Sequence, residues 1–271
     1  MGPLPSDRCA ILAGDDTGVW GRRMKLAGLV VAGAACAAAG AWFTFIETPA
    51  RAAQEARHKM TFFVTSAGLP GGAHLGGLAQ ADAHCTDLYV GATGDKTLIW
   101  HAYLSTQARP GVPAVNARDR IGKGPWYNAA GVMVAKSVDD LHSPENNVRP
   151  ETVLNELDQQ GTGHGAPPDP RDQSWSFMES HPWSVRHEIL TGSQADGRAF
   201  PPEHDHTCDN WTSDEDGNSL FRARFNTIHG AEVGQPEPGE SWNDHGISGG
   251  CTREALARSH GAGLFYCFAV N

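Results

Sequence analysis

The stretch LFYCFAV, residues 264–270, closes the chain, and the rest of the fold can be inferred outward from it. Aromatic and branched apolar residues dominate the stretch, so we expect a strong β-strand. Because successive side chains of a strand point to opposite faces, Leu264, Tyr266 and Phe268 should lie on one face and Cys267 on the other. The chain is therefore expected to end in a strand that carries a cysteine.

The N-terminal part of the sequence is typical of an export signal. Basic residues at 22, 23 and 25 precede an apolar run, residues 26–46, and an Ala-Arg-Ala triplet at 50–52 is followed by Ala53. This order predicts a secretory signal peptide cleaved before Ala53. The run is also long enough to span a bilayer, so an uncleaved transmembrane anchor is the alternative. We expect a signal peptide or anchor over residues 1–52, of which 1–23 are an over-extended start, and one secreted, periplasmic or extracellular domain over residues 53–271.

Export gives the cysteines a structural meaning. Two of the six, Cys9 and Cys36, fall in the N-terminal segment. The four that remain in the domain are Cys85, Cys208, Cys251 and Cys267. An even number of cysteines in an oxidising compartment predicts two disulfides, and four cysteines allow three pairings. The sequence has no Cys-x-x-Cys pair, which argues against a cysteine zinc site or a redox motif.

Charge and composition limit the partners. The chain carries a formal charge of −10, and it stays acidic without residues 1–52. Such a surface repels phosphate backbones and anionic lipids, so we expect no nucleic-acid partner and a membrane contact only through an uncleaved N-terminal segment. The 32 glycines and 17 prolines favour a loop-rich fold.

The remaining patterns predict a single α+β domain without repeats. Strands are expected over residues 59–68 and 97–106, a hairpin over 126–134, and a strand and turn over 187–200. Apolar residues at helical spacing predict a helix from residue 75 to 89, with Cys85 on its buried face and Gly91 as its stop. Residues 208–213 are interpreted as a short strand and residues 252–261 as a helical turn. Residues 162–174 are too rich in Gly, Pro and Asp for regular structure and are expected to form a surface excursion.

Residues 241–251, SWNDHGISGGC, contain a triplet that can supply hard oxygen ligands to calcium, Trp242-Asn243-Asp244. A second partial motif, Gln235-Pro236-Glu237, precedes it. The alternative interpretation is that Trp242 packs in the core while Asn243 and Asp244 make turn hydrogen bonds. The candidate ligand-binding residues are Gln235, Glu237, Glu240, Trp242, Asn243 and Asp244, and the candidate calcium ligands are Glu237, Asn243 and Asp244.

Two further motifs are interpreted as chance matches. Residues 246–250, GISGG, fit the G-x-S-x-G pattern of serine hydrolases, but Ser248 follows polar residues and not a buried strand. His204 and His206 flank Asp205 like a metal-binding pair, yet a chain with 13 histidines contains many such pairs. We therefore expect no catalytic residues and treat the histidine pair as an exposed polar turn.

Taken in order, five segments resemble a family of secreted bacterial proteins with the C-type-lectin-like fold, and within that fold the endostatin type. The segments are LGGLAQADAHC (75–85), AYLST (102–106), VNARDRI (115–121), CDNWTS (208–213) and GLFYCFAV (263–270), and the resemblance covers about residues 61–271. It implies small antiparallel sheets with helices and long disulfide-tethered loops. It also implies pairing of Cys85 with Cys267 and of Cys208 with Cys251.

The resemblance also implies a function, because members of this family are often labelled lectins. It implies an exported, non-catalytic protein that binds carbohydrate through loops near residues 187–206 and 235–248, with calcium as the cofactor to test. One departure weakens the calcium site: in sugar-binding lectins the Gln-Pro motif precedes the second cysteine, whereas Gln235 follows Cys208. The alternative function is a structural or protein-interaction module of the cell envelope, with an envelope protein as partner and no sugar ligand.

Overall fold

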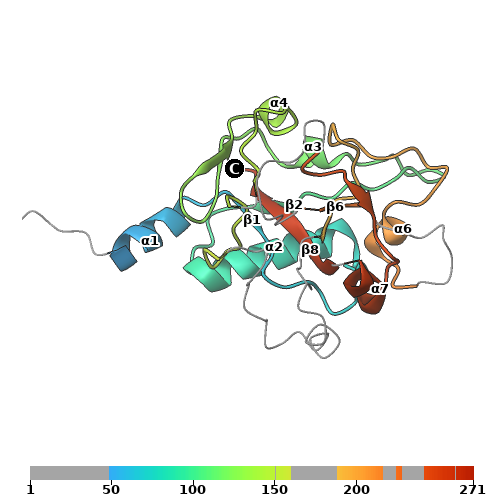
Figure 1. Ribbon diagram of the computed structural model, residues 1–271, viewed down its shortest axis with the longest axis horizontal. Helices are drawn as coiled ribbons and strands as arrows, with labels where there is room; N and C mark the ends of the chain where they lie inside the picture. The colour runs from blue at the N-terminus through green and yellow to red at the C-terminus, as the bar shows by residue number, and fades with distance from the viewer. Residues whose placement is uncertain (1–48, 150, 160–187, 216–223, 228–240, 260) are drawn as a thin grey trace, which may run out of the picture. The chain divides into compact units, whose positions relative to one another are not determined.

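The computed structural model describes residues 49–149, 151–159, 188–215, 224–227, 241–259 and 261–271, with residues 49, 50 and 224–227 described by their backbone only. They fall within one compact unit, Ile46–Asn271. The unit has the mixed α+β composition expected from the sequence (Figure 1). The apolar run at 26–46 lies outside the described residues, and among the residues that are described no helix is long and apolar enough to cross a bilayer.

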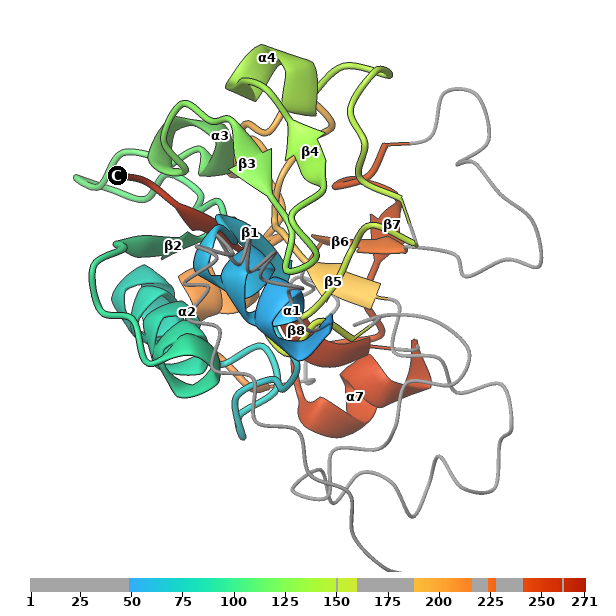
Figure 2. The same cartoon turned by 90° about the vertical axis from the view of Figure 1, so that its left-hand side faces the viewer.

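The closing strand organises the larger sheet. Strand β8 (Gly261–Ala269) pairs antiparallel with β1 (Phe62–Val64) and with β2 (Trp100–Ala102), and parallel with β5 (Glu188–Leu190). Strands β6 (Arg224–Thr227) and β7 (Gly246–Ile247) extend the sheet beyond β5. The expected strand at 264–270 is thus confirmed. It lies inside the sheet, between β1 and β5, and it also pairs with β2, so it joins early and late segments of the domain (Figure 2).

The two faces of β8 supply two hydrophobic cores, as the alternation of its side chains predicts. Leu264, Tyr266 and Phe268 belong to one buried cluster, and Phe265 and Cys267 belong to the other. The first cluster is covered by the hairpin of β3 (Trp126–Tyr127) and β4 (Met133–Ala135), together with α3 (Ala117–Arg120) and α4 (Val138–Leu141). The second is covered by α2 (Gly77–Thr93), which lies on the other side of β8 (Figure 2).

Both disulfides form in the nested arrangement that the resemblance implies. Cys85 on α2 is bonded to Cys267 on β8, with their Cα atoms 5.7 Å apart. Cys208 is bonded to Cys251, with a Cα separation of 5.8 Å. All four are fully buried, and the outer bridge fixes the first long helix to the closing strand. Two disulfides are what an oxidising compartment favours.

Helix α2 is longer than its sequence pattern predicts. It continues through Gly91 and ends at Gly94, which has a positive φ of 74° and donates its N–H to the Val90 carbonyl. A largely buried ion pair also holds α2 in place. Asp82 accepts hydrogen bonds from the backbone N–H of Ala102 (2.8 Å) and from Arg120 (2.7 Å), and both side chains of this ion pair are largely buried. The contact joins α2 to β2 and α3.

Several other boundaries differ from the expectation. Helix α1 (Pro49–His58) was not predicted, and it contains the expected cleavage site before Ala53. Strands β1 and β2 are shorter than the ten-residue segments expected: three residues of each strand pair in register with β8. Helix α7 (Arg253–Arg258) is confirmed, and the hydroxyl of Thr252 caps it by accepting from the Ala255 N–H (3.1 Å). The predicted excursion at 162–174 lies outside the described residues.

Candidate ligand-binding face

Four loop segments meet beside β2 and β5, and we call them together the loop face: residues 103–107, 191–199, 204–211 and 241–248. Backbone and side-chain hydrogen bonds join them directly. The Ser105 N–H donates to the Thr191 carbonyl (3.0 Å), and Trp211 Nε1 donates to the Ser105 carbonyl (2.7 Å). The loop face therefore brings together residues as far apart in the sequence as Tyr103 and Asn243, which are separated by 140 residues, and it includes the predicted triplet at 242–244.

Trp242 lies inside the molecule. Its side chain is 7% exposed, and its ring packs against Tyr103 (centroids 4.8 Å apart) and against Tyr266 (5.2 Å, edge-on). The ring of His142 completes this contact at 5.9 Å. Aromatic pairs at such distances stabilise a core beyond their apolar area. Trp242 thus fixes the loop to the core and does not present a stacking surface to solvent.

Asn243 is also buried, and its side chain is used within the protein. It is fully shielded from solvent, and its Nδ2 donates to Tyr103 Oη (2.8 Å) and to the Gln194 carbonyl (2.9 Å). Its Oδ1 accepts from Ser241 Oγ, and its backbone carbonyl accepts from Thr191 Oγ1 (2.7 Å). This is the core packing and turn bonding that the sequence left open as the alternative for the triplet.

The hydrogen bonds of Asn243 continue to a histidine. Tyr103 Oη lies 2.7 Å from His142 Nε2, and His142 Nδ1 lies 2.7 Å from the Val138 carbonyl. Burial raises the pKa of Tyr103 well above its ordinary value. Burial lowers the pKa of His142, and the positive charge of Arg118 lowers it further. A neutral phenol and a neutral imidazole therefore carry the chain of hydrogen bonds near pH 7.

Residues 208–213 do not form the strand that the sequence pattern suggested. Each residue of Cys208–Trp211 (α6) has a positive φ, between 48° and 68°, so the segment is a left-handed turn without glycine. Each such residue costs about 1–2 kcal/mol. The carboxylate of Asp205 offsets part of this cost by accepting from the N–H groups of Thr207 (2.8 Å) and Asp209 (2.6 Å).

Gln107 connects this turn to the neighbouring loops. Its side chain is 5% exposed, and its backbone N–H donates to Asn210 Oδ1 (2.8 Å) while its carbonyl accepts from Asn210 Nδ2 (3.1 Å). Its side-chain Nε2 donates to the carbonyls of Pro201 (2.6 Å) and His204 (2.8 Å), and its Oε1 accepts from the His206 N–H (2.6 Å). One glutamine thus fastens residues 201–210 to the segment at 103–107.

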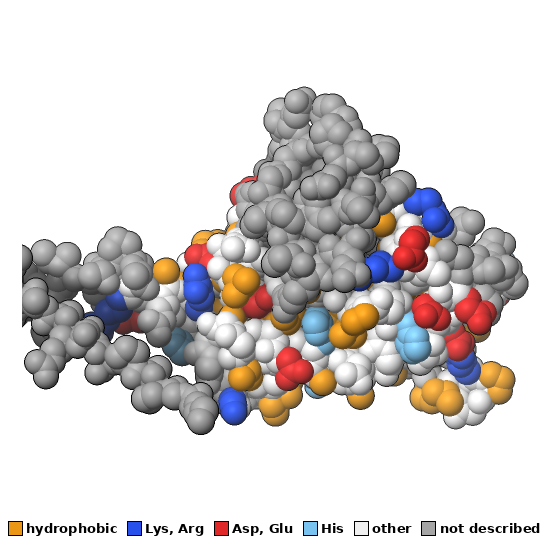
Figure 3. Space-filling model, turned by 90° about the horizontal axis from the view of Figure 1, so that it is seen from below, with side chains coloured by type: hydrophobic (Ala, Val, Ile, Leu, Met, Phe, Trp, Pro, Cys, Tyr) orange, Lys and Arg blue, Asp and Glu red, His pale blue; other side chains and the backbone are white. Residues whose placement is uncertain are grey.

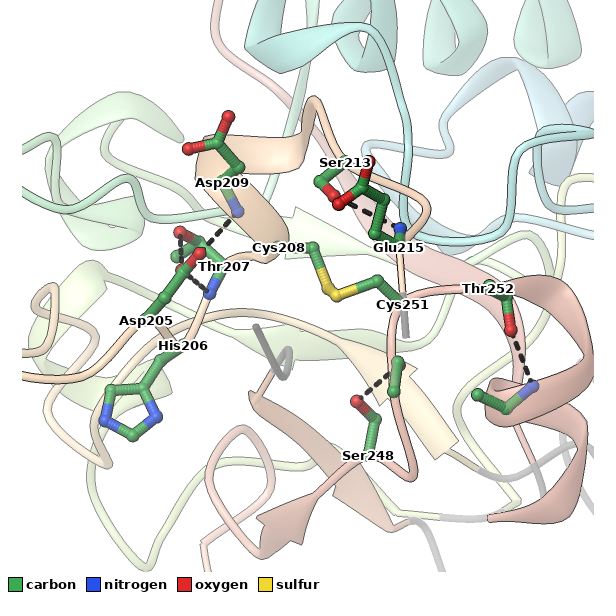
Figure 4. The surroundings of a disulfide bond; sticks show 12 residues. Asp205, His206, Thr207, Cys208, Asp209, Ser213, Glu215, Ser248, Cys251 and Thr252 are labelled. Carbon is green, nitrogen blue, oxygen red and sulfur yellow. Dashed lines mark hydrogen bonds between the residues drawn. A yellow bond between two sulfur atoms is a disulfide. The ribbon is translucent and has the colours of Figure 1, made fainter. Parts of the chain in front are cut away.

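The inner disulfide, Cys208–Cys251, joins the turn at 204–211 to the segment that follows Ser248, as Figure 4 shows. Near it, the Ser248 side chain is 1% exposed and donates to the Gly250 carbonyl (2.9 Å). Ser248 follows the two-residue strand β7, and the next helix begins only at Arg253. A nucleophile elbow instead presents its serine at a tight strand-to-helix turn. The hydroxyl of Ser248 has a structural hydrogen bond and is closed to solvent.

The outward surface of the loop face comes from residues beside the buried ones. His245 and Ile247 are exposed, the latter by 45%, and Asp196 and Arg198 are exposed on the turn after β5. Asp244 is half-buried. Acidic, basic and apolar side chains are interspersed over the described part of the face shown in Figure 3. The exposed groups named here on the loop face are charged or polar, except for Ile247.

The metal prediction is only partly covered by the described residues. Gln235, Glu237 and Glu240 lie outside them, so only Asn243 and Asp244 of the predicted calcium set fall within the described residues. Within the part of the chain that is described, no three His, Cys, Asp or Glu side chains are close enough to hold a metal ion. His206 packs its ring against Phe200 at 4.4 Å.

A comparison with models of known protein families and a comparison with curated proteins each found no match to the chain. The residues that organise the loop face were also not identified from the sequence: Tyr103, Gln107, His142, Gln194 and Asp205. One local signal could have found the last of them. An aspartate two residues before a threonine, as in Asp205-His206-Thr207, often accepts the N–H two residues on. The other four act on distant segments, for which no local pattern exists.

Proposed function

We propose that this protein is an exported, non-catalytic binding protein of the C-type-lectin-like, endostatin type, and that its loop face recognises carbohydrate. Three features support the fold assignment. The first and last strands of the domain pair antiparallel, the first long helix is bonded through Cys85 to the last strand, and the second disulfide lies within the sequence span of the first. Fold alone does not define function, so the functional proposal depends on the loop face.

The observation that carries the functional proposal is that the loop face is held rigid by buried polar contacts. Thr191 and Gln194 both bond to Asn243, Gln107 joins residues 103–107 to residues 201–211, and the Cys208–Cys251 bridge ties the turn at 204–211 to the end of the last loop. Loops that are already ordered bind a flexible polar ligand with less loss of entropy.

The polar surface of the loop face fits the chemistry of sugars. Carboxylate, imidazole and guanidinium groups donate to and accept from vicinal hydroxyls, and the exposed candidates are Asp196, Arg198, Asp244 and His245. Asn243 positions this surface and does not contact the ligand, because its amide groups are used internally. We therefore propose sugar recognition that does not depend on Asn243 as a calcium ligand.

The role of Ser248 supports binding over hydrolysis. Its hydroxyl donates to a carbonyl and is shielded from solvent, so it is not placed to attack a substrate. In the proposal the protein therefore binds its ligand and releases it unchanged. Esterase substrates tested against the wild type and Ser248→Ala should show no difference.

The test is a glycan array followed by calorimetric titration of each hit, with calcium and with a chelator. We expect saturable binding that His245→Ala weakens at least fivefold. The matched control is Asp87→Ala, an exposed substitution on α2, which covers the opposite side of β8. Absence of any glycan response, or equal binding by the His245 variant and the control, would remove the carbohydrate proposal while leaving the fold in place.

One observation favours the alternative of an envelope module. The residues around the expected cleavage site form helix α1, and a peptidase that binds its substrate in extended form would first have to unwind it. In that case residues 26–46 stay as an anchor, and the domain contacts an envelope protein. N-terminal sequencing of the exported protein distinguishes the two: a chain that starts at Ala53 supports the soluble binding protein, and a chain that retains residues 26–46 supports the anchored module.

A further inference from the structure

The hydrogen bonds between His142 and Asn243 have only one consistent arrangement of protons. The Val138 carbonyl can only accept, so His142 Nδ1 carries the ring proton and Nε2 is an acceptor. Tyr103 Oη therefore donates to Nε2, which leaves its oxygen to accept from Asn243 Nδ2 (2.8 Å). The order of donors runs from the loop at 241–248, through the core, to α4.

A second proton on His142 is incompatible with this arrangement. Protonated Nε2 becomes a donor, so Tyr103 Oη faces donors from both His142 and Asn243, and its own proton has to turn elsewhere. Ser193 is next to Tyr103, and its oxygen, which donates to the Thr191 carbonyl (3.0 Å) and pairs with Ser105 (2.9 Å), keeps one lone pair that can accept the phenol proton. Two donors, the imidazolium and the Asn243 amide, then converge on the one phenol oxygen. The bond that holds Asn243 is then weakened.

The surroundings of His142 do not let the ring move away. A Cβ atom added at Gly197 would lie 2.3 Å from His142 Nε2, so the turn after β5 is packed directly on the ring. The charged groups that face the ring are Arg118 from α3, Asp139 from its own helix and Asp196 from that turn. Arg118 bonds to Asp139 Oδ1 (2.9 Å) and to the Asp196 carbonyl (2.7 Å), which keeps a positive charge beside the imidazole.

We propose that His142 is a pH-sensitive lock on the loop face: when it is neutral it fixes Asn243 through Tyr103, and when it is protonated it loosens residues 241–248, which keep the bonds of Asn243 to Thr191 and Gln194. This inference rests on the proposed function for its consequence, which is that ligand is held near neutral pH and released in acid. Burial lowers the pKa of His142 in the folded protein. The lock therefore stays closed at and above the ordinary histidine value of about 6.5, and it opens only as the pH falls through the lowered pKa of the folded protein.

The test is hydrogen–deuterium exchange of the full exported protein without ligand, at pH 7.5 and 5.5, after correction for the intrinsic pH dependence. We expect peptides covering residues 241–251 to exchange about tenfold faster in acid, the factor that loss of one buried hydrogen bond produces. His142→Gln keeps an acceptor for Tyr103 and does not titrate, so its exchange should be the same at both pH values. His245→Gln, an exposed substitution in the same loop, should keep the wild-type response.

Tyr103→Phe provides a second variant in case His142→Gln is not folded by near-ultraviolet circular dichroism. It removes both hydrogen bonds of the hydroxyl, so residues 241–251 should exchange fast at both pH values. A wild-type loop whose exchange does not change with pH, or a His142 or Tyr103 variant that keeps the wild-type response, would overturn the lock. Because no ligand is present, failure of the glycan-binding proposal leaves this result unaffected, and refutation of the lock leaves the glycan-binding proposal standing.

Discussion

Removing the outer disulfide should destabilise the protein more than removing the inner one. The perturbations are the double variants Cys85→Ala/Cys267→Ala and Cys208→Ala/Cys251→Ala. The outer pair is 182 residues apart in the sequence and the inner pair 43. In the chain-entropy description, a cross-link stabilises by restricting the unfolded chain, and the effect grows with the logarithm of loop length.

For these two loops the description gives about 5 kcal/mol for the outer bridge and about 4 kcal/mol for the inner one. All four cysteines are fully buried, so the loss of sulfur packing is similar in the two variants and largely cancels in the comparison. A domain is typically stable by about 5–15 kcal/mol, so the outer variant should be close to unfolded at 25 °C. The inner variant should also lose order in the loop face, since residue 251 then keeps only its core packing and hydrogen bonding and no covalent link to the turn at 208.

The assay is guanidinium unfolding of oxidised wild type and both variants, followed by fluorescence and far-ultraviolet circular dichroism. Wild type treated with a reductant is a further control and should be at least as unstable as the outer variant. An outer variant with an unchanged midpoint, or one more stable than the inner variant, would refute the reasoning. That result would mean that α2 is fixed to β8 by packing alone.

Three further predictions concern single residues. Asp82→Ala should lower the free energy of unfolding by about 2–3 kcal/mol in denaturant titrations, since it leaves a buried arginine and a backbone N–H without their acceptor; a loss under 0.5 kcal/mol would contradict this. Gly197→Ala should lower the free energy of unfolding by more than about 2 kcal/mol, because the new Cβ would lie 2.3 Å from His142 Nε2. The control Gly111→Ala has a similar positive φ but lies in open space, so it should lower this free energy by only about 1 kcal/mol. Equal melting temperatures of the two variants would contradict the prediction. Burial raises the pKa of Glu156. The carboxyl therefore contributes stability below its unfolded pKa, and this stability is lost as the pH rises through the folded value, so Glu156→Gln should gain stability over wild type between about pH 4.5 and 7. Parallel pH profiles of the two proteins would show that the buried carboxyl does not titrate differently on folding.

Local patterns in the sequence predicted much of the frame. The alternation in residues 264–270 gave the closing strand and its two faces, and the spacing around Cys85 gave the long helix. These predictions hold because a buried strand or helix needs its apolar residues at a fixed period, which can be read without knowing the partner. The boundary at Gly91 was wrong by three residues because helix ends depend on which glycine adopts a positive φ, here Gly94.

The loop face could not be predicted in the same way. Asn243 is bonded to Tyr103, which precedes it by 140 residues, and Gln107 is bonded to Asn210, 103 residues further on. The left-handed turn at Cys208–Trp211 even contradicts the local preference of its residues, because contacts from Asp205 and Gln107 outweigh the backbone cost.

The sequence by itself determined the closing strand, the long helix, the number of cysteines available for bonding and the acidic character of the protein. The tertiary structure alone decided that Trp242 and Asn243 face inward, that Ser248 is closed to solvent and that His142 is linked through Tyr103 to a loop a hundred residues away. The physical reason is the sequence separation over which each kind of interaction acts. Periodic burial is a property of neighbouring residues, whereas the hydrogen-bonding partner of a loop side chain is fixed only when distant segments have packed against each other.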